Sequence, residues 1–228
     1  LLPEFSKKAA LGNMNEIAQL FSAGVKIVFF ITIPAMAGLM ALDDKIVALL
    51  FGYGAFNANA IQQTAECLIF LSSGLWAFTG VRLFVTLYYA LSNIRIPLYS
   101  GIIAVFLNLV FCYLFIGSLG LKGLGISVSL SAMAGFIILF INIPGTVNID
   151  KFEIMVSACR SLFLSVIMFF IVKQAAFFIP AAGNNKFLFG AGVIICICFG
   201  MVFYFSANFF ISSPELKLLK NGFTRNKL

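Results

Sequence analysis

Long apolar blocks alternate with short polar breaks along the chain. Each block is long enough to cross the ~30 Å hydrocarbon core of a bilayer as a helix that rises about 1.5 Å per residue. A helix is expected because a segment in lipid must satisfy its own backbone hydrogen bonds, and the blocks lack the alternation of barrel strands. The pattern predicts an all-α helix bundle with six transmembrane helices, at residues 20–42, 65–91, 97–117, 123–143, 157–179 and 187–211.

The breaks contain residues that are typical of turns. Pro97 favours a helix start after SNIRI, and Pro34 is expected to kink the first span and to assist gating motion. The stretch KIVALLFGYGAFNANAIQQTAE is too apolar for a solvated loop and too interrupted for a span. We expect it to lie in the membrane interface and to turn at Gly52 and Gly54, either as a cap on the bundle or as a substrate contact.

Composition excludes a soluble domain. The chain is 62% hydrophobic and 10% charged, whereas about a quarter of the residues in a soluble domain are charged. In a membrane protein, the net charge of +7 indicates basic cytoplasmic loops rather than a nucleic acid partner. We therefore expect membrane lipids to surround the chain and to be its contact partners.

The distribution of Lys and Arg predicts the orientation. Six spans place both ends on one side, which carries nine of these cations in its loops and ends against three on the other side. Because basic loops stay in the cytoplasm, both ends are expected there. The opening LLPEFSKKAA resembles the end of an earlier hydrophobic segment, so we expect part of a longer protein. The predicted organisation is a helix end and cytoplasmic loop (1–19), four spans (20–143), a cytoplasmic linker (144–156), two further spans (157–211) and a basic cytoplasmic tail (212–228).

Charged residues within the spans are the strongest candidates for function. Arg82 lies near the middle of the second span, where a charge costs several kcal/mol, so it is expected to face a polar cavity, an acidic partner or an anionic ligand. The alternative is that its long side chain snorkels to the inner interface. Snorkelling also explains Lys26 and Lys173, and Glu66 is expected to begin a span where a carboxylate suits the helix dipole.

Small polar residues indicate contacts between helices. Asn108 lies in mid-span, where its amide either bonds a neighbouring helix or lines a cavity. Ser127, Ser129 and Ser131 alternate with apolar residues in a glycine-rich segment, a pattern that favours close helix packing over ion binding. The sequence has no histidine, no carboxylate pair within a span and no phosphate-binding loop, so we expect neither an enzyme nor a metal or cofactor site.

Four stretches, in order, resemble motifs of the lipid II flippases of the MurJ (MviN) family, in the multidrug/oligosaccharidyl-lipid/polysaccharide exporter superfamily. They are LLPEFSK, TIPAMAGLMAL with IVALLFGYGAF, VRLFVTLYYALSNIRIP, and GLKGLGISVSLSA. The resemblance covers residues 1–142, and beyond these only hydropathy and helix count match. It implies that the six spans are helices nine to fourteen of a fourteen-helix, two-lobe transporter.

The resemblance also implies a function. Such proteins move the lipid-linked peptidoglycan precursor, lipid II, from the inner to the outer leaflet of the bacterial inner membrane by alternating access, and cell wall synthesis proteins are further expected partners. Arg82 matches the family's basic residue in helix ten, and cations in the cavity suit the precursor's pyrophosphate. The last two spans take the place of helices that line a lipid-tail groove.

The chain departs from the family pattern at several positions. Asn93 replaces an aspartate, and Ile94 and Ile96 replace threonines. Asn108 matches an asparagine with which some relatives bind a cation, but Cys112 stands in place of their acidic residue, which argues against cation coupling. The alternatives are another exporter of the superfamily for drugs or oligosaccharide-lipids, a membrane scaffold that transports nothing, and a lipid-modifying enzyme.

Overall fold

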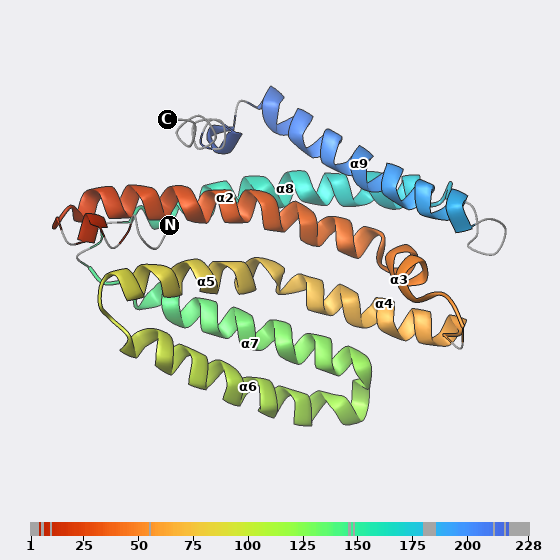
Figure 1. Ribbon diagram of the computed structural model, residues 1–228, viewed down its shortest axis with the longest axis horizontal. Coiled ribbons are helices and arrows are strands. Elements are labelled where there is room, and N and C mark those ends of the chain that lie inside the picture. The colour runs from red at the N-terminus through yellow and green to blue at the C-terminus, as the bar shows by residue number, and fades with distance from the viewer. Residues whose placement is uncertain are drawn as a thin grey trace.

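The protein is a bundle of membrane-length helices (Figure 1). The computed structural model describes residues 5, 7–9, 11–54, 56–145, 147, 149–179, 186–211, 213–216 and 218, and within these ranges the regular secondary structure is helical. The helices are α2 (Met14–Ala41), α3 (Asp43–Phe51), α4 (Ala58–Ser73), α5 (Leu75–Ala90), α6 (Arg95–Leu119), α7 (Leu121–Ile141), α8 (Lys151–Ala176) and α9 (Lys186–Phe210). Apart from residues 213–216 and 218, the tail expected over 212–228 lies outside the described residues.

Six segments are long and apolar enough to span a membrane, as the sequence predicted. They are α2, α4 with α5, α6, α7, α8 and nearly all of α9. Two of them, α4 and α8, begin well before the predicted apolar blocks, because polar residues cap them. The Asn57 side chain accepts a hydrogen bond of 2.9 Å from the Ala60 N–H at the start of α4. Asp150 accepts bonds of 3.0 and 3.1 Å from the first turn of α8. Capping satisfies N–H groups that a helix leaves unpaired, so helices extend into polar sequence.

Successive spans run in opposite directions (Figure 1). The start of α2 and the end of α5 lie at one end of the bundle, and α9 runs toward that end. At the other end lie α3, the start of α4 and the turn between α6 and α7. We call the first end the inner end and the second the outer end, after the predicted orientation.

Two hydrophobic clusters hold the bundle together, and α2 contributes to both. The larger cluster joins α2, α5 and α7 through aromatic side chains. Phe84 meets Phe21 and Phe136 edge-on, with ring centroids 4.9 and 5.3 Å apart, and Trp76 lies 5.1 Å from Phe136. Edge-to-face geometry is favourable beyond the burial of area. The second cluster joins α2 to α8 and α9.

Small and polar residues bring α7 close to its neighbours, as the serine and glycine pattern predicted. The Ser129 hydroxyl donates a 2.6 Å hydrogen bond to the Phe70 carbonyl at the end of α4. Gly125 lies so near α4 that a Cβ would be 2.7 Å from the Cys67 carbonyl oxygen. Helices in lipid associate through such close packing and polar contacts, since apolar burial adds little there.

We predict that Gly125→Ala destabilises the protein by about 1–3 kcal/mol, the usual cost of overpacking. The methyl group would force α7 away from α4. Thermal loss of the monodisperse size-exclusion peak of the full-length protein measures this. The control is Gly101→Ala on α6, where a Cβ meets nothing within 4 Å. Equal stability of the two variants would contradict the close packing.

Candidate functional site

An apolar groove runs between α2, α8 and α9. Its cavity has a volume of about 540 Å³. The lining residues are almost all hydrophobic and include Phe30, Pro34, Gly38, Val172, Gly200 and Tyr204. The α2 residues belong to its second half, so the groove occupies the middle and outer part of the bundle. Its shape and lining suit a hydrocarbon chain.

Pro34 contributes directly to this groove. It lies inside α2, which continues as helix to Ala41. Proline cannot donate a backbone hydrogen bond, so the carbonyl one turn earlier, on Phe30, loses its helical partner. Such a position weakens the helix locally. The gating role of Pro34 stays a prediction.

The glycine turn follows a short helix at the outer end. The helix α3 ends at Gly52, whose N–H donates 2.9 Å to the Ala48 carbonyl. A Cβ on Gly52 would be 2.3 Å from that oxygen, and Gly54 has a φ of +65°, so both positions require glycine. Leu50 and Phe51 are half exposed, at 54% and 50%. An interfacial position at the end of the bundle fits this apolar exposure.

Arg82 lies on α5, away from the groove. The opposite side of this helix, with Leu83, Phe84 and Leu87, packs into the core, whereas Arg82 is exposed. Thr86 and the half-exposed Tyr89 share its face. The guanidinium forms no ion pair or hydrogen bond with the described residues. An arginine that deep in a span needs water or an anion beside it, or its side chain must snorkel to the interface.

Asn108 bonds a neighbouring helix. Its Nδ2 donates 3.3 Å to the Ser131 hydroxyl of α7, and the Cys112 thiol donates to its Oδ1 at 3.9 Å. The structure thus shows one of the two contacts expected for this amide. A contact with substrate stays a prediction, and the structure does not bring Asn108 and Arg82 into one site.

Two charges within the spans have partners that sequence reasoning missed. Lys26 is buried and pairs with Glu153 of α8 at 2.6 Å, so it does not snorkel to the interface. Glu66 lies well inside α4, which begins at Ala58, and pairs with Lys122 of α7 at 2.8 Å. It therefore does not begin a helix, and its ion pair ties α4 to the α6–α7 turn. Lys173 lies 5.3 Å from the Phe169 ring.

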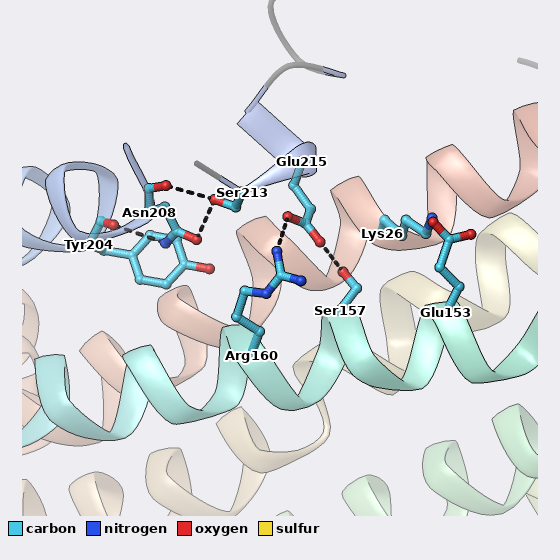
Figure 2. Close-up of polar contacts among 8 residues, drawn as sticks. All are labelled: Lys26, Glu153, Ser157, Arg160, Tyr204, Asn208, Ser213 and Glu215. Atoms are coloured by element: carbon cyan, nitrogen blue, oxygen red, sulfur yellow. Dashed lines mark hydrogen bonds and ion pairs between the residues drawn. The ribbon is translucent and has the colours of Figure 1, made fainter. Parts of the chain in front are cut away.

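A buried polar cluster joins α8 to the segment after α9 (Figure 2). The Glu215 carboxylate is 1% exposed. It accepts a hydrogen bond of 2.6 Å from the Ser157 hydroxyl and pairs with Arg160 at 3.4 Å. In sequence these residues look like ordinary loop and interface residues. Only the packing of residues 213–216 onto α8 brings them together.

Comparison with known proteins places the chain in a family. The family model described as lipid II flippase MurJ matches residues 1–198. The chain belongs to the MurJ family. The match extends beyond residue 142, where the resemblance of motifs ends.

Individual relatives carry the same family name, and a solved structure shares the fold. A probable lipid II flippase MurJ of Vibrio cholerae is 31% identical over 140 residues, which cover 61% of this chain and 27% of the relative. One of Rhizobium meliloti is 25% identical over 237 residues, which cover 99% of this chain and 43% of the relative. A solved structure of lipid II flippase MurJ in an inward closed conformation has a TM-score of 0.71 and 21% identity, covering 92% of this chain and 42% of that one. The chain thus spans less than half the length of these MurJ proteins, and it shares their multi-pass helical fold.

We predict that position 82 faces water in the full-length protein. Arg82→Cys, in a background without the native cysteines, is expected to react with a charged, membrane-impermeant thiol reagent. The control is Phe106→Cys on α6, a 63% exposed position on a helix that presents apolar side chains outward. Phe106→Cys should stay unlabelled in lipid. If Arg82→Cys is not labelled, position 82 does not face water, and snorkelling to the membrane interface explains Arg82.

Proposed function

We propose that this chain is the C-terminal part of a lipid II flippase, comprising helices nine to fourteen. The whole protein would move lipid-linked peptidoglycan precursor from the inner to the outer leaflet of the bacterial inner membrane for cell wall synthesis. Membership of the MurJ family over residues 1–198 carries this proposal. Transport by alternating access between two lobes needs no catalytic residues and no cofactor, so we do not expect an enzyme.

The apolar groove is the proposed binding site for the precursor's lipid tail. It lies between α2 and the α8–α9 hairpin. The resemblance to the family implies that these last two spans take the place of its tail-binding helices. A hydrocarbon tail gains little by leaving one apolar medium for another, so the groove must act through close packing and shape. The groove would therefore align the tail while the headgroup crosses the bilayer.

Arg82 is the proposed contact for the precursor's pyrophosphate. Its exposed guanidinium has no acidic partner among the described residues. A charge in this position is costly unless water or an anion compensates for it. The rest of the two-lobe protein would complete an aqueous cavity around it. In such a cavity a guanidinium binds phosphate oxygens in a bidentate way.

The proposed orientation separates the two elements along the membrane normal. With both ends of the segment in the cytoplasm, Arg82 lies in the inner half of its span, because α5 ends at Ala90 at the inner end. The groove residues from Pro34 to Leu42 lie in the outer half of α2. Headgroup and tail would thus be held at different depths.

Complementation tests the function. The full-length gene is expected to rescue a strain depleted of its essential lipid II flippase, whereas Arg82→Ala, at matched expression, should fail. Arg82→Lys, which keeps the charge, should rescue at least in part. Rescue by both the intact gene and Arg82→Ala would support the flippase function and show that Arg82 is not needed for transport. No rescue by the inserted intact protein would point to another lipid-linked substrate or to a scaffold.

We also predict that Gly38→Phe weakens binding of lipid II to the purified full-length protein. Gly38 lines the groove, and a Cβ there meets nothing within 4 Å, so a side chain can leave the backbone at this position and its ring would occupy groove space. Native mass spectrometry measures the bound fraction. Gly101→Phe on α6 is the matched control and should bind as the parent does. Equal binding by both variants would exclude the groove as the tail site.

A further inference from the structure

Toward the inner end, the axis of α9 diverges from that of α8, and the chain after it turns back toward α8 (Figure 1). The two helices are in close contact at Gly200, where a Cβ would be 2.8 Å from Val172 Cγ2. Tyr204, further along α9, still packs in the hydrophobic cluster that includes Leu164 and Met168 of α8. The ring of Tyr204 packs on Phe30 of α2, 5.2 Å between centroids, and forms part of the groove wall.

Residues 213–216 bridge the gap between the end of α9 and α8. We call this segment the strap. Ser213 and Glu215 are each 1% exposed, although they follow a membrane span and lie among polar sequence. Glu215 binds Ser157 and Arg160, which lie one turn apart on α8 (Figure 2). The strap is thus fixed to α8 by a carboxylate with two partners.

The strap is also fixed to α9 itself. The Ser213 hydroxyl donates to the backbone carbonyl and to the side-chain oxygen of Asn208, both at 2.9 Å. Asn208, 1% exposed, donates its Nδ2 to the Tyr204 carbonyl at 2.9 Å. The strap therefore has two separate anchors: Glu215 on α8, and Ser213, two residues earlier, on the turn of α9 that carries the groove wall (Figure 2).

The two partners of the ion pair differ in their access to water. The Arg160 side chain is 30% exposed and that of Glu215 only 2%. A buried carboxylate without a partner is costly, so loss of Arg160 or Ser157 favours the departure of Glu215 into water. Arg160, at the surface, loses little when the strap leaves. We therefore expect the contact between Glu215 and α8 to break as a whole, with the carboxylate moving into water, rather than to loosen gradually.

We propose that the strap is a releasable latch that sets the position of the inner half of α9 and with it the Tyr204 wall of the groove. With Glu215 seated on α8, the groove is held at its observed width. With Glu215 released, α9 pivots about its close contact at Gly200 and the groove widens toward the inner leaflet. The role of the groove as a tail site rests on the proposed function, whereas the latch itself is a property of the fold.

Spin-label distances in the full-length protein in liposomes test the latch. Labels replace Met155 on α8 and Phe209 on α9, which are 58% and 75% exposed, in a background without native cysteines. Glu215→Ala and Arg160→Ala are each expected to lengthen and broaden this distance beyond the width of the parent distribution. The matched control is Glu66→Ala, which removes an ion pair at the outer end and should leave the distance unchanged.

A second label pair distinguishes release of the strap from general unfolding of the α8–α9 hairpin. Labels at Phe170 and Ile194, in the outer halves of α8 and α9, should keep the parent distance in every variant, since Gly200 still holds the helices together. An unchanged Met155–Phe209 distance in Glu215→Ala would overturn the latch, and so would an equal change in both label pairs. These distances are measured without precursor, so failure of complementation by the intact gene would leave the latch result standing.

Discussion

The absence of water in the bilayer core is the constraint on which this structure depends. Each span must satisfy its own backbone, and a buried polar side chain is stabilised when it finds a partner on a neighbouring helix. The Tyr88 hydroxyl, fully buried, donates 2.9 Å to the Leu139 carbonyl, and Ser129 bonds the end of α4. Such contacts fix how the helices are rotated against one another, which apolar surface alone would leave undetermined.

Steric fit supplies the rest of the specificity. At Gly74, between α4 and α5, a Cβ would be 2.8 Å from the Ser129 hydroxyl, so α7 can cross this span only at a glycine. Elsewhere the packing between helices is incomplete. The helix α9 packs closely on α8 at Gly200 but leaves an apolar groove beside α2. Close packing and open groove thus arise from the same distribution of small and large residues.

Two ion pairs involve α8, one to the bundle and one to the strap. Lys26 joins α2 to Glu153 of α8, and Arg160 joins α8 to Glu215 of the strap. Glu153 and Arg160 lie in the first half of α8, whereas the groove residues of this helix, Met168 and Val172, lie further along it toward the outer end. An arrangement of this kind anchors the hairpin at one end and leaves its apolar wall free to adapt to a lipid chain.

The sequence by itself determined the all-α class, the six spans, the glycine turn at Gly52 and Gly54, and the resemblance to the MurJ family, because hydropathy, length and turn chemistry are local properties. Only the tertiary structure decided which charges pair. Lys26 and Glu66 have partners on other helices, and Glu215 is buried against residues 55 and 58 positions earlier in the chain. Such contacts depend on how whole helices rotate and cross, and this is set by the sum of their packing surfaces rather than by any one segment.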